Sequence, residues 1–155
     1  MGIKSKRHKG TRFAVIALFF LVGCAPAARL YMPAGGELRQ SDLEQIIAEN
    51  PLGISENIKI TTLDQGESVS HHIVQVRDRE VPHMHKIHDG TVIMMKGRGY
   101  LVIENRRMDL SVGDVIHIPR DVVHFYVNTA SEPSVALVIF SPPFDGKDYV
   151  PVTAP

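Results

Sequence analysis

The sequence has little cysteine, no excess of either charge and no long hydrophobic run. Cys24 is the only cysteine among 155 residues, which excludes a fold stapled by internal disulfides. The apolar run at residues 13–22 has ten residues, whereas a helix needs roughly 20 to cross a bilayer. No nucleophile elbow, phosphate loop or pair of glycosidase carboxylates is found, so the commonest motif-defined enzyme classes are excluded.

The even balance of charge hides an asymmetry along the chain. Its first 23 residues include five basic residues and no acidic one, which leaves 12 basic against 17 acidic residues and a net charge near −5 for the remainder. A domain of that sign lacks the basic surface that binds nucleic acid. With 44% apolar residues in 155, the chain is long enough for one domain with a core and too short for two.

The basic start leads into the short apolar run, and small residues follow, which is the pattern of a secretory signal peptide over residues 1–23. Residues 21–24, Leu-Val-Gly-Cys, resemble the bacterial lipobox, whose cysteine is lipidated and becomes the first residue of the mature protein. The resemblance implies an exported lipoprotein anchored to a membrane through Cys24. Ala25 next to it favours the outer membrane, facing the periplasm. An ordinary signal, with Cys24 incidental, is the alternative.

Residues 24–55 are predicted to form a tether followed by one short helix. Residues 25–28 and 33–36 are rich in alanine, proline and glycine, which suits a linker. Residues 41–44, Ser-Asp-Leu-Glu, have the pattern of a helix capping box. The apolar stripe of this helix is expected to cover an edge or an open end of the main domain.

From residue 58 onward, the apolar pattern changes to alternating or continuous runs that are rich in β-branched residues. Turn residues separate these runs. Many short strands with almost no helix indicate an all-β domain, built as an antiparallel barrel or a double-sheet sandwich. The predicted strands are residues 58–63, 69–76, 91–95, 100–104, 115–118, 122–128 and 135–140.

Three histidines of this predicted domain have the spacing of a metal site. His83 and His85 are one residue apart, so on an extended strand their side chains point to the same face. His124, on a later strand, could complete the site.

The residues around these histidines resemble the two sequence motifs of the cupin family. Residues 83–97 resemble the first motif, and residues 113–128 resemble the second except at Asp121, where the family usually has glycine. We expect Asp121 to adopt the left-handed backbone conformation that this turn needs. The resemblance implies an antiparallel double-sheet jelly-roll barrel over residues 56–145 with one short N-terminal helix. Residues 146–155 would be a C-terminal tail, and the turn-rich residues 141–149 are expected to pack across the barrel or against a second subunit.

In cupins, two histidines and a glutamate of the first motif and a histidine of the second hold a divalent metal. The resemblance therefore implies His83, His85 and His124 as ligands. The glutamate position is occupied by Gly90, and its neighbour Asp89 is the candidate for a fourth ligand. Three imidazoles alone would give a zinc-like site with an open position, and an added carboxylate would give the set of iron or manganese cupins. These ligands do not distinguish iron, manganese, zinc and nickel.

The sequence is less informative about the cavity and the function than about the metal ligands. Tyr126 shares strand parity with His124, so we expect it to line the pocket, and the family pattern also places Asn128 there. One hypothesis is a metal-dependent oxygenase or isomerase acting on a small polar molecule. The other is a non-catalytic module of the cell envelope that binds a small molecule or the metal itself. The histidines could also be a relic that binds no metal. Since cupins are commonly dimers, a homodimer is also expected.

Overall fold

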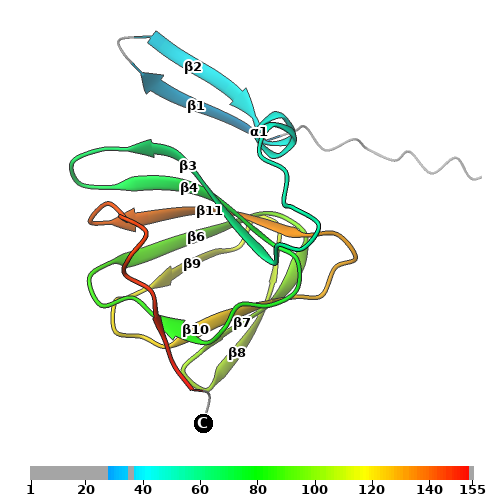
Figure 1. The fold of residues 1–155 in the computed structure, drawn as a ribbon, viewed down its shortest axis with the longest axis vertical. Helices are drawn as coiled ribbons and strands as arrows, with labels where there is room; N and C mark the ends of the chain where they lie inside the picture. The colour runs from blue at the N-terminus through cyan, green and yellow to red at the C-terminus, as the bar shows by residue number, and fades with distance from the viewer. Residues whose placement is uncertain (1–27, 35–36, 154–155) are drawn as a thin grey trace, which may run out of the picture.

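The structure is a computed structural model that describes residues 28–34 and 37–153, so the predicted signal peptide and Cys24 lie outside the described residues. Two antiparallel five-stranded sheets face each other and enclose the interior of a jelly roll (Figure 1). The predicted all-β, double-sheet fold is therefore confirmed. Within the described ranges, no helix is long and apolar enough to cross a membrane.

Successive strands from β4 onward lie in opposite sheets, except for the hairpin of β7 and β8. The first sheet contains, in spatial order, β3 (Ile58–Gln65), β4 (Ser70–Val76), β11 (Ser134–Ser141), β6 (Asp89–Lys96) and β9 (Val115–Ile118). The second contains β12 (Val150–Pro151), β5 (His83–Met84), β10 (His124–Asn128), β7 (Arg98–Ile103) and β8 (Arg106–Ser111).

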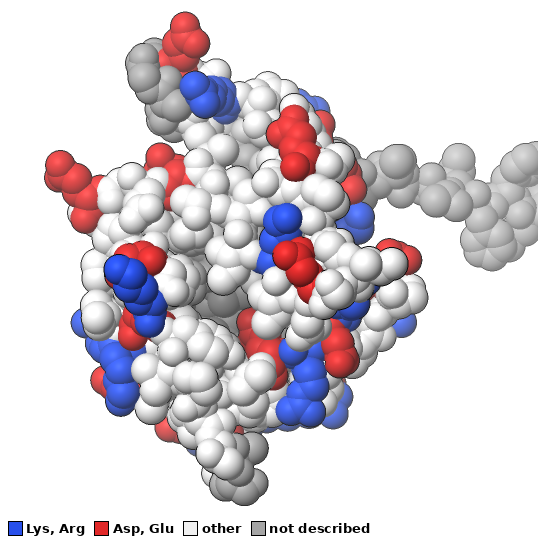
Figure 2. Space-filling model, viewed as in Figure 1, with Lys and Arg blue, Asp and Glu red and all other residues white. Residues whose placement is uncertain are grey.

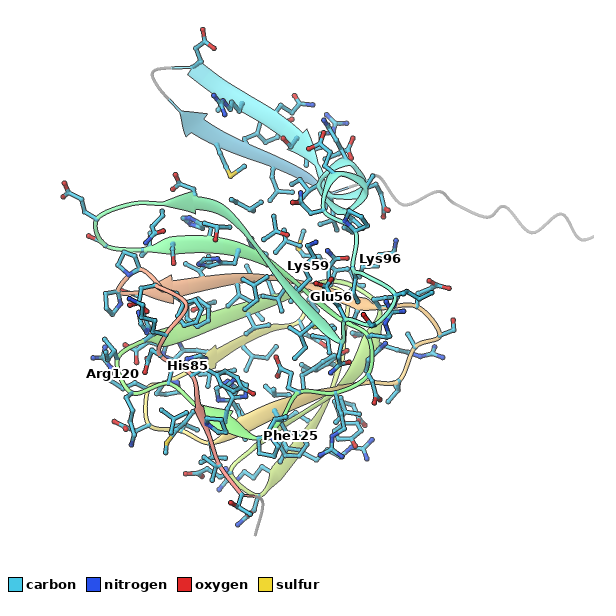
Figure 3. All side chains as sticks on the ribbon, viewed as in Figure 1. Glu56, Lys59, His85, Lys96, Arg120 and Phe125 are labelled. Carbon is cyan, nitrogen blue, oxygen red and sulfur yellow. The ribbon has the colours of Figure 1, made fainter. Side chains whose placement is uncertain are left out.

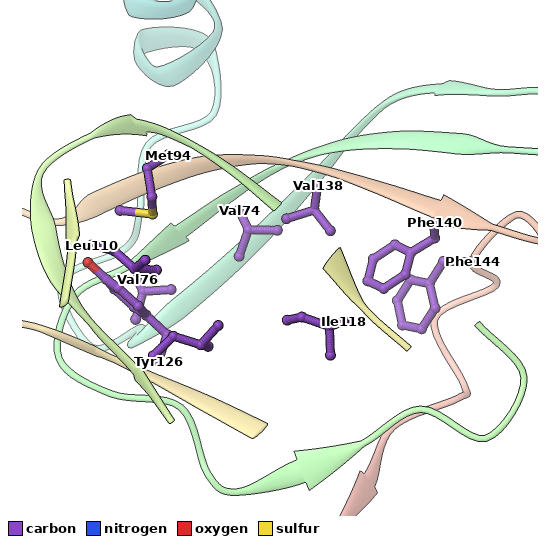
Figure 4. Close-up of a cluster of buried hydrophobic side chains, with 10 residues drawn as sticks. Val74, Val76, Met94, Leu110, Ile118, Tyr126, Val138, Phe140 and Phe144 are labelled. Atoms are coloured by element: carbon purple, nitrogen blue, oxygen red, sulfur yellow. The ribbon is translucent and has the colours of Figure 1, made fainter. Parts of the chain in front are cut away.

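Alternate residues of β4 pack into two different cores, because successive side chains of a strand point to opposite faces. Val74 and Val76 face the space between the sheets and join the main core, where they lie among side chains from both sheets (Figure 4). Ile73 faces the other way and is fully buried in a second core, together with Leu43 and Ile46 of the short helix. The helix thus covers the outer face of the first sheet.

The segment predicted as a tether is a β-hairpin from residue 29 onward. β1 (Arg29–Ala34) pairs with β2 (Glu37–Asp42), and α1 (Leu43–Glu49) follows directly. Leu30 is buried in the second core, and this contact and the strand pairing stabilise a structure that composition alone does not predict. The predicted helix is confirmed, and the side chain of Asp42, the N-cap residue just before it, accepts a hydrogen bond from the backbone N–H of Gln45 at 2.7 Å.

The seven predicted strands are confirmed, with ends that shift by at most two residues, whereas β8 and the two-residue strands β5 and β12 are not among the predicted strands. β8 is an edge strand whose side chains are mostly exposed and charged, so it lacks the apolar pattern on which the prediction depends. Asp121 has a φ of 65°, which confirms the left-handed turn before β10.

Candidate metal centre

Three histidine side chains converge at one end of the space between the sheets. His83 on β5 lies directly opposite His124 on the neighbouring β10, and His85 follows β5. One ring nitrogen from each of the three lies within 4.8 Å of the others. All three side chains are buried, and Figure 3 shows His85 inside the outline of the barrel, near the C-terminal segment.

Backbone carbonyl groups hold each of these imidazoles in one orientation. In every case Nδ1 faces a carbonyl oxygen and donates a hydrogen bond to it, which leaves Nε2 without a proton. A neutral imidazole oriented in this way is the form that binds a metal ion. The pairs are His83 with Val81 at 2.8 Å, His124 with Val122 at 2.9 Å, and His85 with Asp148.

Burial keeps these histidines neutral. Removal from water, helped by the neighbouring imidazoles, lowers the pKa of His83 and of His124 to about 4. Burial also lowers the pKa of His85. At neutral pH each ring therefore has a free lone pair on Nε2, so the donor set fits a divalent metal ion of the kind that imidazole binds.

The C-terminal segment closes over this site. β12 pairs with β5, and the ring of Tyr149 stacks on His83 with 4.3 Å between ring centroids and an angle of 23°. The buried carboxylate of Asp148 accepts hydrogen bonds from the backbone N–H groups of Lys86 and Ile87, each at 2.8 Å. Burial alone would raise the pKa of Asp148, but these hydrogen bonds lower it below its usual range. The predicted tail thus packs across the barrel.

The Asp89 carboxylate lies away from the histidines, which corrects its assignment as a fourth ligand. It pairs with the guanidinium group of Arg120 at 2.7 Å and accepts a hydrogen bond from the Arg120 backbone N–H. These hydrogen bonds lower the pKa of Asp89 to about 2. Arg120 lies at the outer edge of the molecule in Figure 3. Strand alternation is the reason, because Gly90, Val92 and Met94 are the residues of β6 that line the interior.

Gly90 therefore occupies the inward position at which the family has its glutamate. A Cβ atom built there would meet the ring of Phe140 at 3.5 Å. The Phe140 ring also lies edge-on to His85, with 5.2 Å between ring centroids. The aromatic ring of Phe140 thus lies beside the histidines on the side where the family has its glutamate.

Glu80 is a carboxylate of the site that the sequence did not reveal. Its side chain lines the same cavity as the three histidines, and Oε2 accepts a hydrogen bond from the backbone N–H of Tyr126 at 2.8 Å. Burial raises the pKa of Glu80, which the hydrogen bond from Tyr126 and the nearby His124 partly offset. Glu80 follows a run of charged residues, so no apolar pattern or motif marks it as an interior residue.

The two predicted pocket residues differ in position. Tyr126 is buried and lines the cavity, and its hydroxyl donates a hydrogen bond to Ser134 Oγ at 2.8 Å. The side chain of Asn128 instead donates to the backbone oxygens of Arg77 and Glu132 and does not line the cavity. Its assignment to the pocket is corrected, because these hydrogen bonds hold its side chain against the segments that follow β4 and β10.

The cavity beside the histidines lies between the two sheets and has a volume of about 130 Å³. Most of its lining comes from aliphatic and aromatic side chains, and the histidines, Glu80 and Tyr149 form its polar end. Figure 2 shows a hollow near the centre of this face, bordered largely by uncharged residues with acidic atoms on one side. The arrangement offers a metal site that opens into an apolar chamber.

This jelly roll with inward-facing histidines defines a cupin, and the chain belongs to the cupin family. The family model described as a cupin domain matches residues 61–140. An uncharacterized protein of Aquifex aeolicus (strain VF5) is 43% identical over 111 residues, which cover 72% of this chain and 90% of that protein.

Solved structures share the fold at lower sequence identity. KdgF from Halomonas sp. has a TM-score of 0.55 and 23% identity, and the match covers 60% of this chain and 87% of that one. Pac13 of Streptomyces, a nucleoside dehydratase, has a TM-score of 0.53 and 16% identity over 62% of this chain and 78% of that one. At these identities the likeness shows the fold alone.

Proposed function

We propose that this chain is a metal-dependent cupin enzyme whose three histidines hold one divalent ion at the polar end of the barrel cavity. The observation that carries the proposal is the shared arrangement of His83, His85 and His124. In each, Nδ1 donates a hydrogen bond to a backbone carbonyl oxygen. One ring nitrogen from each residue lies within 4.8 Å of the other two. When bound, the ion would polarise a ligand oxygen or lower the pKa of a bound water.

Glu80 favours an enzyme over a purely binding module. Catalysis beside a metal commonly needs a group that accepts and returns a proton, and such groups have a raised pKa when they are carboxylates. Glu80 lines the histidine cavity, and burial raises its pKa. Glu80 is therefore the acid or base of the proposed site.

Metal analysis of the full chain, purified in detergent, tests the proposal. We expect about one zinc ion per chain after loading, and at least a roughly 100-fold lower affinity in His83→Ala and His124→Ala. His117→Ala is the matched control, because His117 is an exposed histidine on β9. Asp89→Ala is a second control. A zinc content that is far below one ion and unchanged by either ligand variant would exclude the metal centre.

We also propose that the protein is an exported lipoprotein held on the outer membrane through Cys24. The support is the sequence pattern of residues 1–24, a basic start and a short apolar run that ends in Leu-Val-Gly-Cys. Lipid chains on this residue would give stable anchoring. Cells grown with a radioactive fatty acid should label the wild type and not Cys24→Ser. Equal labelling of the two proteins, or of neither, would reject the anchor.

A further inference from the structure

The size of the interior cavity limits what can bind there. Its volume is about 130 Å³, and an engineered apolar cavity of about 150 Å³ in another protein accommodates one benzene molecule. The cavity is walled mainly by aliphatic and aromatic side chains, from the first sheet Val74, Ile118, Val138 and Phe140 and from the second Leu110 and Tyr126 (Figure 4). A ligand with one ring, or a branched chain of similar volume, matches this space.

The polar groups of the cavity lie at the histidine end. The hydroxyl of Tyr126, further along β10, is already bound to Ser134 Oγ and lies in the apolar part of the cluster in Figure 4. A sugar or nucleoside placed in the chamber would leave several hydroxyl groups without partners. Each buried unpaired polar group costs about 1–3 kcal/mol, so a ligand with many hydroxyls is disfavoured.

Gly90 and Phe140 extend the apolar wall up to the metal centre. At the inward position where a carboxylate would be expected, there is no side chain, and the Phe140 ring lies beside it and beside His85. Phe144 stacks on Phe140 with 4.7 Å between centroids. A ring that entered the chamber would therefore have aromatic neighbours next to the histidines, which favours an aromatic ligand.

From this geometry we propose that the cavity binds an apolar, single-ring molecule with one neutral oxygen-bearing group, and that this oxygen faces the three histidines and Glu80. The position of the oxygen rests on the proposed metal centre, whereas the apolar chamber does not. One carboxylate oxygen of Glu80 is held by Tyr126 N–H, and the other can accept a hydrogen bond from a hydroxyl group. Because the carboxyl group of Glu80 already lies at this end of the cavity, a neutral phenol fits better in the metal-free site than a negatively charged benzoate.

Binding of small probes tests the inference on the full chain in detergent. Methyl NMR spectra would be recorded with toluene, phenol, benzoate and uridine, without metal and with zinc. Toluene should bind equally with and without zinc, and phenol should bind about tenfold more tightly with zinc. Uridine should bind more weakly than phenol in both states, and benzoate should bind more weakly than phenol without metal. Binding of uridine in preference to phenol would overturn the proposal.

Variants separate the chamber from the metal centre. Val138→Phe and Val92→Phe should each fill the chamber and abolish toluene binding, and Val115→Phe is the matched control because Val115 is 64% exposed. His124→Ala should keep toluene binding but lose the effect of zinc on phenol. Absence of toluene binding by the folded wild type would overturn the chamber even if zinc binds. Toluene binding without any zinc binding would instead reject the metal centre, and with it the position of the oxygen.

Discussion

The backbone carbonyl oxygen of Asp148 accepts the hydrogen bond that orients His85, although 63 residues separate the two in the sequence. The Asp148 side chain holds this carbonyl in place, because its carboxylate binds the backbone N–H groups of the loop that follows His85 and also Nδ1 of His88 at 2.7 Å. The C-terminal segment is therefore part of the proposed metal centre as well as its cover.

Replacing Asp148 with alanine should weaken both the fold and the site. The carboxylate is 5% exposed and its four donors would lose their acceptor, so we expect a loss of about 3 kcal/mol in the free energy of unfolding. Zinc affinity should fall by about tenfold or more, since His85 would lose its orientation. Urea unfolding and zinc competition measure the two effects. Asp145→Ala is the control, because Asp145 is exposed. Equal effects of the two substitutions would contradict the role of Asp148.

The neutral histidines predict that the metal-free protein loses stability on acidification. In the unfolded chain, histidines take up protons around their ordinary pKa of 6.5, whereas burial lowers the pKa of His83 and His124 to about 4 in the folded state. The unfolded state then binds more protons between these two values, so the free energy of unfolding should decrease as the pH falls through this window. Urea unfolding across the window measures this slope. The slope should be smaller in the double variant His83→Asn, His124→Asn, and an unchanged slope would show that these residues do not cause it.

A carboxylate introduced at Gly90 should reach the metal centre. The position faces the interior, and the contact of an added Cβ with Phe140 is an ordinary van der Waals distance of 3.5 Å. We expect Gly90→Glu to bind Mn²⁺ about tenfold more tightly than the wild type, since manganese prefers carboxylate ligands. Asp89→Glu should leave the affinity unchanged, because its carboxylate stays on the side of Arg120. Calorimetry with Mn²⁺ distinguishes the two variants. A gain in affinity only in Asp89→Glu would mean that residue 89, and not residue 90, faces the interior.

Alanine substitutions at two glycines with the same unusual backbone conformation distinguish the cost of backbone strain from the cost of steric clash. Gly97 and Gly113 have φ angles of 84° and 96°. A Cβ on Gly97 would lie 2.9 Å from Ser134 Cα, whereas one on Gly113 meets nothing within 4 Å. Gly113→Ala should cost about 1 kcal/mol in the free energy of unfolding and Gly97→Ala about 3 kcal/mol or more. Urea unfolding measures both, and equal losses would place the whole cost in the backbone conformation.

The predicted strands and the three histidines depend on local patterns, which is why the sequence reveals them. β4 and β11 have runs of apolar residues, and the spacing of His83 and His85 fixes their common face. By contrast, β5 and β12 have two residues each and are strands only because of their partners. The hairpin of residues 29–42 depends in the same way on a distant contact, the burial of Leu30.

The residues that lie beside the three histidines could not be predicted from local sequence patterns. Whether Asp89 or Gly90 faces the histidines depends on which residues of β6 point inward. A shift of one residue in the strand register would exchange the two. Glu80 is an interior residue only because its backbone and side chain pair with Tyr126, 46 residues later. Its sequence neighbours Arg77, Asp78 and Arg79 are all exposed, so its own position resembles a solvated turn.

The link between Asp148 and His85 also sets the order in which the site can form. His83 and His85 precede this carbonyl by more than 60 residues in the sequence. Until residues 148–151 have packed against the barrel and paired with β5, His85 lacks the carbonyl that selects its tautomer. The proposed metal centre is therefore assembled only when the two distant segments have folded together.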